Sequence, residues 1–162
     1  MVGREVEVFV AIDAPVERVW DLVSDITLMP DLSTELQRVE WADGFDRPCL
    51  GAQFLGTNCH DAIGTWTTRS QITACEPHRV FEWAVGDVTA PAAVWRFDLS
   101  PATDGTQLRY SARLGPGKSG VTMLIDRDPD RAEEIVARRM GQFSTAMQTV
   151  VAGIKRIAET GA

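Results

Sequence analysis

Hydrophobic and polar residues alternate at the start of the chain, which is the pattern of a half-buried β-strand. Between Glu5 and Ile12 three valines share one face of this strand. Apolar residues then recur at helical spacing over Val16–Val23, directly after Pro15, which suits the start of a helix. A second short helix is expected over residues 26–32. The beginning of the chain therefore predicts one strand and two short helices.

Strand patterns dominate the middle of the chain, and turn-forming residues separate them. We expect strands over Leu36–Trp41, Ala52–His60, Thr65–Ala74, Val80–Val85, Ala93–Leu99 and Thr106–Leu114. Consecutive strands joined by short turns pair in an antiparallel meander. With the first strand, they predict a seven-stranded antiparallel sheet.

The segment from Asp130 to Glu159 carries a single apolar stripe at helical spacing and a charged opposite face. A helix of this length would extend for about 45 Å. Only the sheet can cover its stripe, and a curved sheet offers more concave surface than one helix can fill. We therefore expect a cavity of roughly 300 Å³ or more between the sheet and the helix.

Several local sequences, in this order of elements, carry a resemblance to a known family. They are residues 14–20 and 23–25, Met29-Pro30, Gly51–Phe54 and Val94–Phe97. With the long final helix, they resemble the START-like helix-grip superfamily, also called SRPBCC, and its polyketide cyclase/dehydrase-like members in particular. The resemblance implies a single α+β domain over residues 1–162, in which a curved seven-stranded antiparallel sheet wraps around the C-terminal helix. The superfamily includes lipid carriers, hormone receptors, quinone-binding proteins and cyclases, so the fold alone does not settle the function.

The composition is that of a globular protein with an acidic surface. The 162 residues include 16 Lys and Arg and 23 Asp and Glu, which gives a formal net charge of −7. Nucleic acids and anionic membranes need a basic surface, so neither is an expected partner. No apolar run is long enough to insert into a membrane, and the N-terminus does not have the pattern of a signal peptide. The three cysteines show no disulfide spacing, so we expect a reduced, cytoplasmic protein, as a monomer or homodimer.

Motifs that suggest catalysis or metal binding have simpler explanations. The run Ala112–Ser119 ends in Gly-Lys-Ser but lacks the first glycine of a phosphate-binding loop, and no parallel sheet surrounds it. We interpret it as a flexible turn before the final helix. The Cys-His pairs at 59–60 and 75–78 lie at opposite ends of a predicted strand, too far apart to share a metal ion. His60 and Asp61 have no nucleophile beside them. We expect no metal and no organic cofactor, and we assign no catalytic residue.

Large apolar side chains on the inward faces of the strands and final helix are the best candidates to line the cavity. They are Phe54, Trp66, Phe81, Trp83, Trp95, Phe97, Tyr110, Met140, Phe143 and Met147. The same alternation turns Asn58, Ser70 and Tyr110 inward, where they could orient the oxygens of a ligand. They could equally satisfy one another or hold trapped water.

These features favour the binding of a small hydrophobic or aromatic molecule, such as a lipid, an isoprenoid or a polyketide-like compound. Polyketide cyclases of similar fold use an inward arginine, whereas alternation turns Arg69, Arg96 and Arg109 of this chain outward. An aromatase, cyclase or dehydratase acting on a polyketide-like substrate is the alternative. A protein-interaction module of the toxin type is the third reading, and an exposed apolar patch on Val121–Ile125 would favour it.

Overall fold

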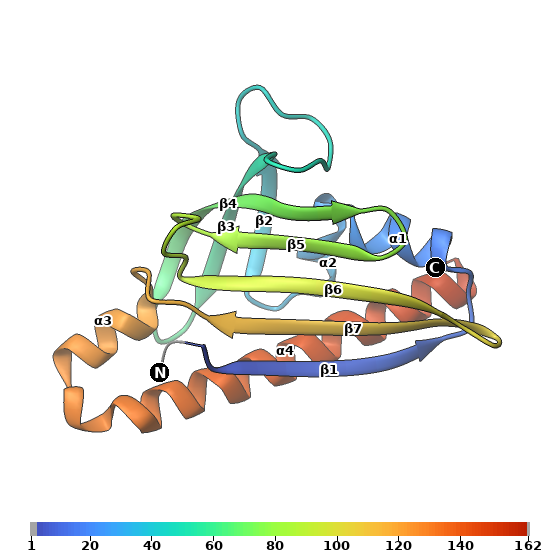
Figure 1. The fold of residues 1–162 in the computed structure, drawn as a ribbon. Coiled ribbons are helices and arrows are strands. Elements are labelled where there is room, and N and C mark those ends of the chain that lie inside the picture. The colour runs from blue at the N-terminus through green and yellow to red at the C-terminus, as the bar shows by residue number, and fades with distance from the viewer. Residues whose placement is uncertain (1–2, 162) are drawn as a thin grey trace.

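Residues 3–161, which the computed structural model describes, form one curled antiparallel sheet and a long helix along its concave side (Figure 1). The strands are β1 (Glu5–Ile12), β2 (Leu36–Trp41), β3 (Gln53–His60), β4 (Gly64–Glu76), β5 (Val80–Val85), β6 (Ala93–Ala102) and β7 (Gly105–Leu114). Their order in the sheet is β1-β7-β6-β5-β4-β3-β2. This confirms the predicted α+β helix-grip fold with its seven-stranded sheet.

Two short helices connect the two edge strands of the sheet, and the long C-terminal helix lies over its concave face. The helices are α1 (Val16–Val23), α2 (Met29–Leu32), α3 (Gly120–Arg127) and α4 (Ala132–Thr160), with 3-10 turns at Ile26–Leu28 and Pro129–Arg131. The pair α1 and α2 carries the chain from the β1 edge to the β2 edge. Within the described residues, no helix is long and apolar enough to cross a bilayer.

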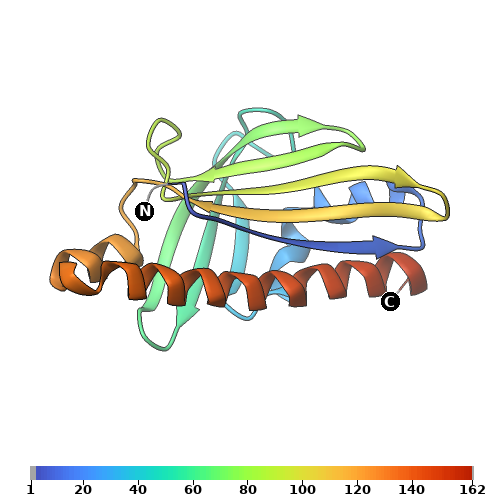
Figure 2. The same cartoon turned by 60° about the horizontal axis from the view of Figure 1, so that its bottom comes forward.

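Helix α4 runs the full length of β1 and lies directly alongside it (Figure 2). Its first turn holds Glu133 and Glu134, whose charges suit the positive end of a helix dipole. It ends at Thr160 and is capped by Gly161, whose φ of 78° is left-handed and whose N–H donates to the Ile157 carbonyl at 2.7 Å. The buried stripe of α4 consists of Val136, Met140, Phe143, Met147, Val150, Val151, Gly153, Ile154 and Ala158.

Two irregularities in strand pairing bend the sheet around α4. The β2–β3 register shifts between Leu36 and Arg38, and the β4–β5 register shifts between Ile72 and Ala74. An extra residue of this kind bends a strand and increases its twist. In Figure 1, β2 and β3 accordingly turn away from the direction of β1, β7 and β6. The bend leaves a hollow on the side that faces α2 and α4.

The segment between Ser119 and α4 contains a helix that was not predicted, because Gly120–Arg127 is helical. Ser119 caps α3: its hydroxyl accepts from the Thr122 N–H at 3.2 Å, and the Thr122 hydroxyl accepts from the Ser119 N–H at 2.8 Å. The Gly-Lys-Ser sequence is therefore a non-helical segment whose serine caps the helix that follows. On α3 Val121 is buried, whereas Met123 and Leu124 are exposed.

The arginines expected to face outward do lie on the outer face of the sheet. Arg109 reaches Glu5 and Glu7 of β1, each at 2.6 Å. Arg96 forms ion pairs with Glu82 of β5 and Asp98 of β6. Arg69 on β4 is exposed. These charges bridge neighbouring strands, and none of the three guanidinium groups lines the concave side.

Two glycines of α4 have different surroundings, which gives a stability prediction. A Cβ at Gly153 would lie 2.6 Å from Leu32 Cδ2, whereas a Cβ at Gly141 would meet no atom within 4 Å. Because alanine has a higher helix propensity than glycine, we expect Gly141→Ala to raise the free energy of unfolding by about 0.5–1 kcal/mol. Gly153→Ala must displace Leu32 and should be at least about 1 kcal/mol less stable than Gly141→Ala. Urea denaturation measures both; equal stabilities would contradict this packing.

Candidate functional site

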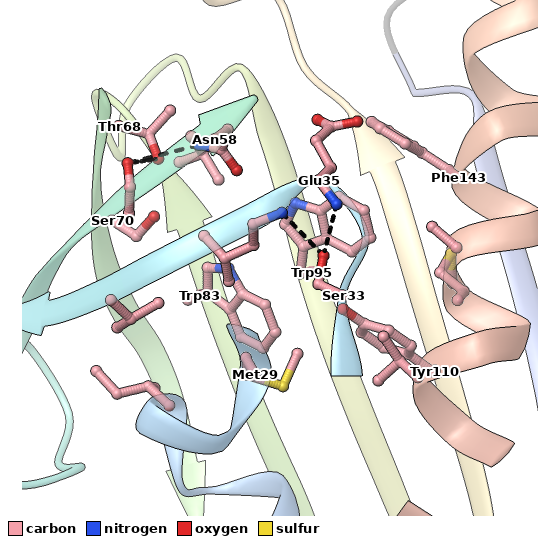
Figure 3. Close-up of a pocket in the computed structure, with 18 of the residues that line it drawn as sticks. Met29, Ser33, Glu35, Asn58, Thr68, Ser70, Trp83, Trp95, Tyr110 and Phe143 are labelled. Carbon is pink, nitrogen blue, oxygen red and sulfur yellow. Dashed lines mark hydrogen bonds between the residues drawn. The ribbon is translucent and has the colours of Figure 1, made fainter. Parts of the chain in front are cut away.

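A cavity of about 150 Å³ lies between the concave face of the sheet and α4 (Figure 3). Strands β2 to β7 supply one wall, α4 supplies the second, and the segment from residue 26 to residue 35 supplies the third. The residues that line it are Ile26, Met29, Ser33, Glu35, Leu36, Val39, Phe54, Gly56, Asn58, Thr68, Ser70, Phe81, Trp83, Val85, Trp95, Tyr110, Gln142, Phe143, Ala146, Met147 and Val150.

The cavity is smaller than the roughly 300 Å³ expected, and that expectation is wrong. Bulky side chains occupy much of the hollow: Trp83 and Trp95 from the sheet, Phe143 from α4, and Met29 from α2. An apolar void of about 150 Å³ can hold a molecule the size of benzene. As it stands, the cavity fits one aromatic ring or a similarly compact group and is too small for a whole lipid.

Most residues proposed from the sequence come together around this cavity. They are Phe54, Asn58, Ser70, Phe81, Trp83, Trp95, Tyr110, Phe143 and Met147. Three others do not line it. Phe97 is fully buried behind Tyr110, with the two ring centroids 4.0 Å apart. Met140 is buried elsewhere on α4. Trp66 is half-buried near the β3–β4 turn, because alternation fixes the face of a residue but not its distance along the strand.

Trp83 is at the centre of the aromatic wall. Its ring centroid lies 5.7 Å from that of Phe81, 6.0 Å from Phe97, 6.3 Å from Phe54 and 6.4 Å from Trp95. Aromatic pairs at such distances stabilise one another by about 0.5–1.5 kcal/mol each beyond their burial. The wall is therefore apolar and held in place from several sides.

Among the hydroxyl groups of the lining, those of Tyr110 and Ser70 differ from those of Ser33 and Thr68 in having no partner within the described residues. Tyr110 and Ser70 are buried, and neither side-chain oxygen has a hydrogen-bond partner among residues 3–161. Within that part of the chain, every fully buried polar side-chain atom has a hydrogen-bond partner. Because these two oxygens have none, they are not fully buried and must face the cavity that their residues line. Burial raises the pKa of Tyr110, so its hydroxyl stays protonated and able to donate. The inward polar groups thus do not satisfy one another directly.

The amide of Asn58 is held only weakly. Its Nδ2 lies 3.5 Å from the carbonyl oxygen of Gly56, which Thr68 Oγ1 also approaches at 3.5 Å. Hydrogen bonds of this length are at the limit of what counts as one. Asn58 is therefore free to turn toward a polar atom in the cavity, together with Ser70 on the neighbouring strand (Figure 3).

An ion pair borders the cavity on the α4 side, and the sequence analysis missed it. The Arg139 guanidinium holds the Glu35 carboxylate at 2.6 and 3.0 Å, and its carbon lies 4.6 Å from the centre of the Phe143 ring. Both Glu35 and Phe143 line the cavity. The two charged residues lie 104 positions apart, and neither belongs to a motif, so no local signal could have paired them.

The lining offers little for acid–base or metal chemistry. Among residues 3–161, Glu35 is the only one that brings a carboxylate to the lining, and that group is already paired with Arg139. His60 and Asp61 border a separate outer groove, and the three cysteines lie outside the cavity lining. Within residues 3–161, no three His, Cys, Asp or Glu side chains are arranged to hold a metal ion.

Comparison with known proteins identifies the family. Residues 3–159 match the model of a family described as polyketide cyclase / dehydrase and lipid transport. The chain belongs to this family. It is also 34% identical to a polyketide-cyclase-like protein of Corynebacterium glutamicum, Cgl2372, covering 94% of this chain and 90% of that one with a TM-score of 0.65. No curated protein matches the chain.

Two more distant structures share the fold. The Zhui aromatase/cyclase of Streptomyces sp. R1128 is 20% identical over 98% of both chains, with a TM-score of 0.68. The di-domain ARO/CYC StfQ of the steffimycin biosynthetic pathway is 14% identical, with a TM-score of 0.70, and the match covers 95% of this chain and 50% of that one. At these identities the likeness concerns architecture. The description of the family itself names both cyclase or dehydrase chemistry and lipid transport, so the family alone does not fix the role of the cavity.

Proposed function

We propose that the protein binds a small, uncharged aromatic or compact hydrophobic molecule that carries a hydroxyl or carbonyl group. The observation behind this proposal is the pair of unpartnered hydroxyls of Tyr110 and Ser70 in a largely apolar cavity with an aromatic wall. Apolar pockets with a few convergent polar groups are typical ligand sites. A volume of about 150 Å³ favours a single ring as the buried part of the ligand.

Tryptophan fluorescence tests the binding directly, because Trp83 and Trp95 both line the cavity. We expect benzyl alcohol, a single ring with one hydroxyl, to change the emission saturably with a Kd of about 0.1–1 mM, as the affinity of so few atoms is limited. Palmitate should cause no saturable change at similar concentrations, because the cavity cannot take its chain. A flat signal with benzyl alcohol, together with no heat of binding in calorimetry, would refute the proposal.

A cyclase or aromatase is the second candidate, and the protonated Tyr110 hydroxyl is what favours it. A phenol that burial keeps neutral could donate a hydrogen bond to a ketone and stabilise an enolate as it forms. We favour binding without turnover, since the described part of the chain brings no histidine or cysteine to the lining and the one carboxylate it brings is paired.

Tyr110→Phe separates the two candidates. For a binding protein the loss of one hydrogen bond should weaken the binding of benzyl alcohol by about 0.5–1.5 kcal/mol, which is a several-fold rise in Kd. Toluene, which lacks the hydroxyl, is the matched probe and should bind both forms equally. For an enzyme the same change should slow turnover of a bound poly-ketone by roughly a hundredfold or more, with affinity nearly intact. Turnover that Tyr110→Phe abolishes would therefore overturn our preference.

A further inference from the structure

A second hollow runs along the outside of α4 and shares part of its wall with the cavity. This outer groove has a volume of about 630 Å³, and Thr34, Gly141, Thr145 and Thr149 are among its lining residues. Glu35, Gln142 and Ala146 line both the outer groove and the inner cavity. The two spaces are therefore neighbours, divided by a thin wall of side chains.

Glu35 and Gln142 form the polar part of this wall, and Arg139, which lines neither space, holds both of them. Besides its two contacts with Glu35, Arg139 donates to Gln142 Oε1 at 3.1 Å. The side chains of Arg139 and Glu35 are only 13% and 26% exposed. A two-pronged arginine–carboxylate contact fixes both partners in one geometry, and partial burial shields it from salt. The pair thus links the segment before β2 to α4 across the boundary between the spaces.

The backbone of Glu35 is held by two hydrogen bonds that do not involve its own side chain. The Glu35 carbonyl accepts from the Cys59 N–H at 2.9 Å, and the Glu35 N–H donates to Ser33 Oγ at 3.2 Å. An opening of the wall would therefore be a rotation of the Glu35 and Arg139 side chains, with the main chain in place. Rotations of this kind need no unfolding.

We propose that the Glu35–Arg139 pair limits the length of the ligand. While the pair is closed, only a single ring fits in the inner cavity. When it opens, the cavity and the outer groove become one site for a longer, uncharged molecule. Its ring would lie against Trp83, and a hydroxyl- or amide-bearing chain would lie along Gln142, Thr145 and Thr149. This inference depends on the proposed function, because it assumes that the cavity binds a ring.

Two probes and one substitution test the inference. The short probe is benzyl alcohol, and the long probe is the same molecule extended at the para position by a butyl chain that ends in a hydroxyl. Calorimetry gives both Kd values. We expect Glu35→Gln, which removes the charge but keeps the shape, to lower the long-to-short Kd ratio about tenfold. Glu40→Gln is the matched control: it breaks the exposed Arg38–Glu40 pair on β2, 2.9 Å long and away from both spaces, and should leave the ratio unchanged.

Two further variants make the result decisive. The exchange Glu35→Arg with Arg139→Glu should restore the pair and return the ratio to that of the wild type. Should Glu35→Gln fail to fold, Arg139→Lys keeps the charge but loses the two-pronged contact, and it should lower the ratio in the same direction. An unchanged ratio in a folded variant, with benzyl alcohol still bound, refutes the length limit alone. Absence of binding of both probes to the wild type refutes the proposed function, and the inference with it.

Discussion

Replacing Phe143 with aspartate is expected to destabilise the protein by about 4 kcal/mol or more. The Phe143 side chain is 7% exposed, and its ring centroid lies 4.8 Å from that of Trp95. Truncating a buried phenylalanine costs about 3–5 kcal/mol, and burying a carboxylate adds to that cost. Arg139 is close enough to offset part of the new charge, but it is already paired with Glu35. The free energy of unfolding from urea denaturation measures the effect.

Phe143→Asn is the control that isolates the charge, because asparagine has nearly the shape of aspartate. We expect Phe143→Asn to lose most of the stability and Phe143→Asp to lose still more near neutral pH. The difference between the variants should shrink as the pH falls, since a desolvated carboxylate has a raised pKa and becomes protonated first in the folded state. A melting temperature unchanged by Phe143→Asp would show that this face of α4 does not pack against the sheet.

The elements of the fold were predictable because each signal is local. Alternation over Glu5–Ile12 and the apolar stripe of α4 both appear in the structure close to where the sequence placed them. Helix α3 was not predicted, because the Gly-Lys-Ser sequence before it is typical of a turn and its eight residues are too few to show a clear helical period. The start of the helix is fixed by the capping box of Ser119 and Thr122. This capping box has threonine at the position where glutamate or glutamine is usual.

The site was only partly predictable, because a cavity depends on depth and on distant partners. Period-two alternation correctly turned Trp83 and Tyr110 inward. It also turned Trp66 inward, but nothing in a single strand shows how far along the sheet the cavity extends. The Glu35–Arg139 pair joins segments from opposite ends of the chain and leaves no trace in local pattern. The size of the cavity is likewise a result of how Met29, Trp95 and their neighbours pack together, which composition does not reveal.

Replacing Trp83 with alanine should destabilise the protein by about 3–5 kcal/mol, because the residue is 9% exposed and packs against several other rings. The new space would adjoin the existing cavity and enlarge it. Indole has the shape of the missing side chain, so it should bind there and restore stability. At a hundred times its Kd, a ligand of the folded state adds about 2.7 kcal/mol.

Trp66→Ala is the matched control for this rescue, since Trp66 is also a strand tryptophan but lies outside the cavity lining. Thermal unfolding with increasing indole should show a rise in melting temperature for Trp83→Ala that is clearly larger than for Trp66→Ala or the wild type. An equal rise in all three would mean that indole binds the surface nonspecifically. No rise in any of them, with Trp83→Ala destabilised as expected, would mean that the structure collapses around the deletion, so that the aromatic wall supports the fold without maintaining a space for a ligand.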